Sequence, residues 1–298
     1  MEQPLTSVVL MSLTAVAAGA SLWAWRGLRR GREGHPRPAV SLAMALMLLA
    51  SGVLLLGRWW HSGELTRPLH AHVDGLVLIA SLLLAALLYL RWRPRMLMVS
   101  VIGLPVLAFL YAWAVCAAAW TYQPFQLESL TGVWSWLHLM GVYVGTLCFV
   151  VGAVAAAAYL YVHRRIKLKD DPASIGRLPS LEKLEGMVIN SATVGFVVLS
   201  IGLIGGIVVL GREPDVLSRG GWMITKIVMA VVAWLIYAVL INVRFTSRFR
   251  GPRAAWLSIA GLVLIIATYG LVTALPSASA AEEPTPAAAV APDEGGRG

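Results

Sequence analysis

Apolar runs of membrane-spanning length alternate with short polar segments along most of this 298-residue chain. About 20 apolar residues cross a hydrocarbon core of roughly 30 Å as a helix, because a helix rises about 1.5 Å per residue. The runs lack the alternating ten-residue pattern that is typical of a membrane β-barrel. The pattern therefore predicts eight helical spans, at residues 5–25, 39–57, 74–90, 96–120, 134–162, 187–210, 222–243 and 254–275.

These spans predict one all-α integral membrane domain over residues 1–275. The remaining residues, 276–298, are rich in proline, alanine and acidic side chains and have little apolar surface to bury. We expect this segment to be a disordered external tail. We also expect the first apolar run to be a retained span, since its arginines follow it, whereas the positive charge of a cleavable signal peptide precedes the apolar run.

Basic residues fall mainly between the spans on one side of the predicted membrane. Alternating the loops gives that side eighteen of the 24 lysines and arginines, with a cluster at residues 164–183. Loops rich in lysine and arginine stay in the cytoplasm. We therefore predict that both termini are outside, and that the protein lies in the inner (cytoplasmic) membrane of a bacterium.

The composition agrees with a membrane protein and narrows its partners. Hydrophobic residues make up 58% of the chain and charged residues 13%, and the mean hydropathy is +0.75. The net charge of +9 lies in the loops, so it indicates contact with anionic membrane lipid and no nucleic acid. Cys116 and Cys148 both lie in apolar runs, so neither a disulfide framework nor a zinc motif is expected.

The sequence contains no set of residues for nucleophilic or acid–base catalysis, so we expect a protein that is not an enzyme. Glu182 and Glu185 stand at the start of the sixth span, where acidic side chains favour a helix N-terminus. Lys226, just inside the seventh span, either reaches outward to the interface or an anionic partner, or is a functional charge.

Two glycine pairs four residues apart lie within the spans, Gly141 with Gly145 and Gly202 with Gly206. Such spacing lets two helices approach closely. It also occurs among ordinary small residues in packed spans, so the pattern leaves both interpretations open.

Tryptophan and histidine gather on the predicted outer face. Trp134 and His138 share one face of the fifth span, with Trp136 between them, and Trp222 opens the seventh span. A neutral imidazole is a good axial ligand for haem iron, and flat aromatic surfaces suit a porphyrin. Tryptophan is also common at any membrane interface, so the residues alone leave haem binding as one of two interpretations.

The first outer loop, residues 57–75, holds His70 and His72 two positions apart. This pair could bind a metal ion, but in a loop the more ordinary interpretation is two hydrated histidines.

Several motifs together resemble the cytochrome c assembly family, the CcsA/ResC superfamily. They are a histidine opening a long span, a Leu-Pro-x-Leu-x-x-Leu-Glu element, a lysine with a Trp-Leu-Ile-Tyr-Ala run, and Arg-Gly-x-Arg-Ala. The likeness covers roughly residues 57–275 in order, spacing and number of spans. Here the motifs are His138, 178–185, Lys226 with 234–238, and 250–254, and Asp74 stands near the family's acidic position.

The resemblance implies haem handling at the outer face, with His138 as a ligand of haem iron and with five further residues near the haem: Trp134, Trp136, Trp222, His70 and His72. It implies a cytochrome c synthetase subunit or apocytochrome c as partner. The chain departs from haem-exporting members where they carry Trp-x-Trp-Asp and two further histidines. Here those places hold SRGGW, Asn242 and PSASA.

These departures resemble the HemX/YpjD-like branch of the family. That branch implies an alternative function, a membrane regulator of tetrapyrrole biosynthesis that contacts a cytosolic enzyme through the inner loops without binding haem. A small-solute transporter is a third class, which is disfavoured because no two spans carry matching glycine or proline breaks.

Overall fold

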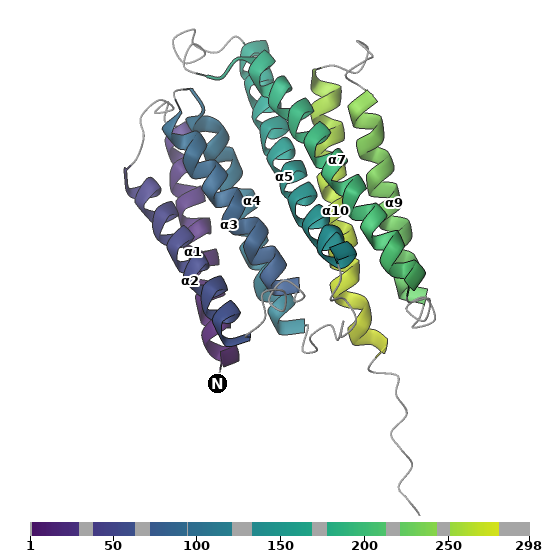
Figure 1. The fold of residues 1–298 in the computed structure, drawn as a ribbon. Helices are drawn as coiled ribbons and strands as arrows, with labels where there is room; N and C mark the ends of the chain where they lie inside the picture. The colour runs from purple at the N-terminus through teal and green to yellow at the C-terminus, as the bar shows by residue number, and fades with distance from the viewer. Residues whose placement is uncertain are drawn as a thin grey trace, which may run out of the picture.

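A computed structural model describes residues 2–29, 38–62, 72–93, 95–120, 133–168, 178–212, 221–242 and 251–279. This part of the chain is all helical, as predicted. Its helices run up and down in sequence (Figure 1). They are α1 (Glu2–Arg29), α2 (Pro38–Ser62), α3 (His72–Trp92), α4 (Leu97–Trp120), α5 (Val133–Lys167), α7 (Leu181–Arg212), α9 (Gly221–Asn242) and α10 (Pro252–Ser279).

The eight described helices correspond one to one with the eight predicted spans, so the all-α membrane fold is confirmed. Six of them, α1 to α5 and α7, are long and apolar enough to cross a membrane. The other two contain shorter apolar stretches among the described side chains, Ile227–Val239 in α9 and Pro252–Ala267 in α10. Helix α10 continues to Ser279, and the predicted tail beyond it lies outside the described residues.

The helices form two groups that lie side by side (Figure 1). In the first group α4 packs against α3 and α1, and α2 packs on α3. In the second, α5 packs along α7, and α10 joins α5 to α9. Helices α3 and α4 meet α5 and so connect the two groups. Helix α5 therefore stands at the centre, with α7 on one side and α3 on another.

Lipid-facing positions follow the helical period, as α2 illustrates. Five aliphatic side chains spaced by three or four residues each remain more than half exposed, which is expected when lipid covers one face of a helix. They are Leu42, Leu46, Leu49, Val53 and Leu56. The interior is apolar as well, and Phe149 of α5 stacks on Tyr237 of α9 with ring centroids 3.3 Å apart.

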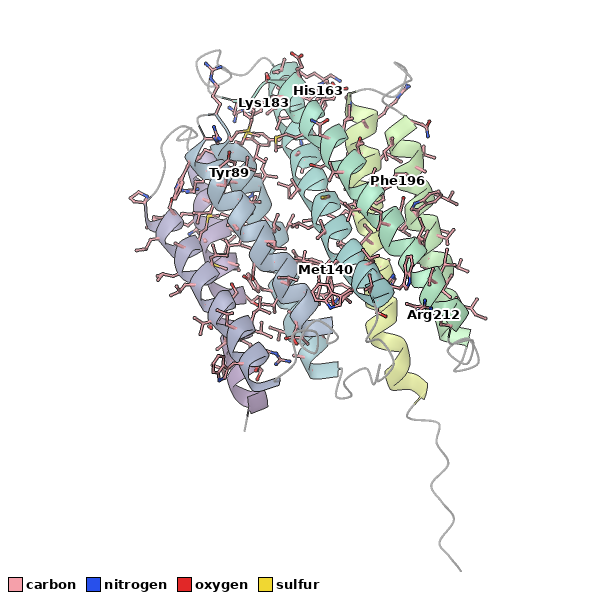
Figure 2. The ribbon with its side chains drawn as sticks, in the orientation of Figure 1. Tyr89, Met140, His163, Lys183, Phe196 and Arg212 are labelled. Atoms are coloured by element: carbon pink, nitrogen blue, oxygen red, sulfur yellow. The ribbon has the colours of Figure 1, made fainter. Side chains whose placement is uncertain are left out.

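The two ends of the bundle differ in charge as the loops predicted. Tyr89, His163 and Lys183 lie at one end and Arg212 at the other (Figure 2). The end with His163 and Lys183 carries the basic cluster after α5, and we call it the inner end. The first residues of α1 and the last of α10 lie at the opposite, outer end (Figure 1).

The inner ends of α7 and α10 are joined by a side chain whose role the sequence only partly indicated. The Ser180 hydroxyl accepts a hydrogen bond from the Lys183 N–H at 3.3 Å and so caps α7. Glu182 lies in the first turn of α7, as expected for a helix N-terminus. Glu185 does more, since its Oε1 accepts a hydrogen bond from the backbone N–H of Gly251 at 3.3 Å. Gly251 has φ of +75°, a conformation that favours glycine, and it leads into α10.

Candidate functional site

The site begins with an unusually close contact between α5 and α7. A Cβ atom added to Gly141 would lie 2.5 Å from the Cα of Gly202. A Cβ added to Gly145 would lie 3.1 Å from the Cβ of Leu199, one turn further along. Only glycine allows backbones to approach so closely, so these residues set the distance between the two helices. The close-approach interpretation of both glycine pairs is confirmed.

His138 lies at the outer end of this contact, on the face of α5 that meets α7. Its Nδ1 is 2.8 Å from the carbonyl oxygen of Gly202. A Cβ added to Gly206 would lie 2.8 Å from Nδ1 and 3.0 Å from Cε1 of the ring. The imidazole therefore fits into a notch on α7 that exists because position 206 has no side chain.

The backbone of α5 fits the same notch. A Cβ on Gly205 would lie 2.9 Å from the carbonyl oxygen of Trp134 and 3.0 Å from the backbone nitrogen of His138. Trp134 and His138 thus share the face of α5 that meets α7, as their spacing predicted. This backbone contact therefore sets the axial position of His138 along α7, and the notch sets the orientation of its ring.

The hydrogen bond to Gly202 determines which ring nitrogen of neutral His138 carries hydrogen. A backbone carbonyl only accepts hydrogen bonds, so Nδ1 must be the donor. The other nitrogen, Nε2, then has a lone pair that this contact leaves available. Histidines that bind metals in proteins are usually held in this way, with one N–H donated to a carbonyl or carboxylate. The geometry of His138 therefore suits an axial ligand of haem iron.

Aromatic surface surrounds the start of α5. Trp134 and Trp136 are each a little over a third exposed, and Val133 before them is 72% exposed. Flat, partly exposed indole rings beside a histidine suit contact with a planar apolar ligand. Trp222 lies in the first turn of α9, which packs against α7, but its side chain is not among those described.

The structure does not describe the side chains of the other predicted histidines. His70 lies outside the described residues, and of His72 only the backbone, at the start of α3, is described. Gly75 of α3 packs against the ring of Tyr143, which is five residues beyond His138 on α5. Five residues turn a helix by roughly 140° net, so α3 and α7 meet α5 on well-separated faces. A shared site of His138 with His70 or His72 stays a prediction.

An ion pair at the outer ends of α2 and α3 was not predicted. Arg58 Nε lies 2.6 Å from Oδ1 of Asp74, and the side chains are 37% and 1% exposed. A buried carboxylate in a span needs such a partner. The pair joins the last turns of α2 to the first turn of α3.

The remaining predictions concern metal binding, the cysteines, Asn242 and Lys226. Among the residues that the structure describes, no three His, Cys, Asp or Glu side chains gather where they could hold a metal ion. Cys116 and Cys148 are both free thiols. Asn242, at the position of a family histidine, is exposed and donates its side-chain N–H to the carbonyl of Ala238 at 2.8 Å. The side chain of Lys226 is not among those described, so its two interpretations stay open.

Together, the fold and the site define a multi-pass helical membrane protein with a positioned imidazole at one end of a close helix pair. Comparison with known proteins then identifies the family. The model of the family described as "Cytochrome C assembly protein" matches residues 41–277, most of the chain. The chain belongs to the cytochrome c assembly protein family, as its motifs suggested.

Curated relatives are similar over nearly their full length. The chain is 26% identical over 287 residues to the cytochrome c biogenesis protein CcsA of Prochlorococcus marinus (strain MIT 9303), covering 87% of this chain and 86% of that protein. It is 26% identical over 307 residues to CcsA of Synechococcus sp. (strain WH7803), covering 90% and 92%. No solved structure matches the chain. These relatives do not separate the HemX/YpjD-like branch from the rest of the family, so that finer assignment stays a prediction.

Proposed function

We propose that this protein acts in cytochrome c assembly by holding haem at the outer face of the bacterial inner membrane, for delivery to a partner. His138 is the axial ligand through Nε2, and Trp134 and Trp136 provide apolar contact beside it. The partner is a cytochrome c synthetase subunit or apocytochrome c. The protein binds and presents its cargo and does not itself catalyse a bond-forming step.

One observation carries this proposal, the hydrogen bond from Nδ1 of His138 to the carbonyl oxygen of Gly202. This bond selects the tautomer that leaves Nε2 able to bind iron. Bound haem would supply the iron and the vinyl groups through which it is attached to a cytochrome c. This chain would supply the axial ligand, the apolar contact and the orientation of the haem. Membership of the cytochrome c assembly family supports the same function.

An absorption spectrum of the detergent-purified protein with a pyridine haemochrome assay tests the ligand. Wild type is compared with His138→Ala and with a matched control, His163→Ala, at the inner end of the same helix. His163 stacks on Tyr159, with ring centroids 6.0 Å apart, and is remote from the proposed site. We expect a Soret band in wild type and His163→Ala, and its loss or shift in His138→Ala.

A second readout separates the ligand role from a folding defect. Imidazole added to His138→Gly should restore the haem spectrum, because the free base replaces the missing ring. In cells, His138→Ala should lower the holocytochrome c level while His163→Ala leaves it unchanged. A wild type that folds but stays colourless when haem is supplied would rule out the haem carrier.

The alternative function, a HemX-like regulator of tetrapyrrole synthesis, is favoured by a specific observation. The haem-exporter histidine is replaced by Asn242, whose amide is occupied by the backbone of its own helix. This protein would contact a cytosolic enzyme through its basic inner loops. Capture of a tetrapyrrole-synthesis enzyme from lysate by His138→Ala as efficiently as by wild type, together with a colourless wild type, would support this alternative.

A further inference from the structure

The two helix groups touch at the inner end through an aromatic contact between α1 and α5. The rings of Trp25 and Tyr161 have centroids 6.2 Å apart and an interplanar angle of 48°. Trp25 is 40% exposed, so the contact lies at the rim of the bundle. Tyrosine and tryptophan prefer the depth of the lipid headgroups, which is where the basic inner loops place this end.

An arginine is held against the tyrosine of this pair. Arg165 follows Tyr161 by one helical turn, and its Nη1 donates a hydrogen bond to the Tyr161 hydroxyl at 3.0 Å. Its guanidinium carbon lies 5.8 Å from the centre of the Tyr161 ring. A guanidinium fixed in this way loses little further conformational entropy when it binds an anion.

A second arginine lies next in sequence to the tryptophan of this contact, on α1. Arg26 follows Trp25 directly and is exposed. Arg164 and Lys167, in the last turn of α5 with Arg165, add further positive charge. Arginine pairs two N–H groups with phosphate oxygens, and the exposed indole of Trp25 offers an apolar surface to the glycerol and the first carbons of an acyl chain.

We propose that an anionic phospholipid of the inner leaflet binds against the Trp25–Tyr161 contact between the inner ends of α1 and α5. Its phosphate interacts with Arg26 and Arg165, and its chains descend past Trp25. A lipid headgroup is favoured over free phosphate because this contact lies at headgroup depth and combines positive charge with the exposed apolar surface of Trp25. The lipid joins the two helix groups at the inner end and is independent of haem at the outer end.

Native mass spectrometry of the full-length protein tests this site in mixed micelles of equal phosphatidylglycerol and phosphatidylcholine. Wild type should retain phosphatidylglycerol preferentially. Arg165→Gln and Arg26→Gln should each lower that preference at least about tenfold, because a hydrogen bond to a charged group contributes roughly 1.5–3 kcal/mol, whereas a basic residue that only lies near an anionic surface contributes about 1 kcal/mol. Tyr161→Phe, which removes the hydroxyl that holds Arg165, should lower it by less and provides a second variant.

Arg93 is a matched control, because it makes the same contact with Tyr89 on α3. Its Nε lies 3.1 Å from the Tyr89 hydroxyl and its guanidinium carbon 4.9 Å from the ring centre. Arg93→Gln should lower the lipid preference by no more than about fivefold, the effect of one basic residue that lies near an anionic surface without contacting the lipid. An equal loss in Arg93→Gln, equal retention of both lipids by wild type, or displacement by millimolar inorganic phosphate would each overturn the proposal. Variants are compared only if their thermal unfolding in phosphatidylcholine matches wild type.

Discussion

Replacing Gly206 with alanine adds a methyl group at the position where the His138 ring packs. The new Cβ would lie 2.8 Å from Nδ1 and 3.0 Å from Cε1. Ordinary contacts between such atoms are about 3.5 Å or longer, so the ring or the helix must move by roughly 0.7 Å. Such a shift weakens the hydrogen bond to Gly202 and changes the direction of Nε2.

The Gly206→Ala substitution has two opposing effects on the stability of the protein. Haem affinity can be compared with wild type only if the net loss of stability is small. Overpacking costs about 1–3 kcal/mol, whereas alanine favours a helix over glycine by up to about 1 kcal/mol. We therefore expect a modest loss of stability. Groups that orient a metal ligand typically change metal affinity by about 10- to 100-fold when they are altered. If the proposed function holds, Gly206→Ala lowers haem affinity by that factor.

The assay is a haem titration of purified protein followed by the Soret band, with thermal unfolding as a check on the fold. Gly211→Ala is the matched control, because it lies on the same helix and a Cβ there would meet nothing within 4 Å. It should bind haem like wild type. Wild-type affinity and spectrum in Gly206→Ala, or an equal loss in Gly211→Ala, would refute the reasoning.

Three further predictions test the packing. Gly141→Leu should prevent the close contact of α5 with α7 and lower the thermal stability in detergent by several degrees; an unchanged melting temperature would contradict the glycine argument. Arg58→Gln should destabilise more than Asp74→Asn, because it leaves a buried carboxylate unpaired, whereas the asparagine variant leaves a half-exposed cation; the reverse order of unfolding temperatures would refute this. Trp234→Phe removes the 2.9 Å hydrogen bond to Ser200 and part of the ring that stacks on Phe196, so it should cost more than about 1 kcal/mol in chemical unfolding; unfolding like wild type would contradict this contact.

The sequence determined the number of helices, their approximate ends and the basic end of the bundle. Length, hydropathy and charge are local properties, and a bilayer converts them into spans and orientation with little influence from distant residues. The family could be recognised for a related reason, since its motifs occur in order along the chain. Spacing also singled out His138 and the two glycine pairs, but it left open whether the glycines allow a close helix contact and whether the histidine binds haem.

Only the tertiary structure decided how these residues combine. The sequence alone does not show that Gly206 packs against the ring of His138. That contact depends on the register of α7 relative to α5, which is the position of one helix along the axis of the other. Side chains and glycines distributed over both helices set that register together. The same is true of Glu185, which reaches the start of α10, and of Asp74, whose partner Arg58 lies 16 residues away on another helix. Each of these contacts joins two different helices. The hydrophobic periodicity of the sequence predicts each helix separately, and only tertiary packing determines which residues of the two helices meet.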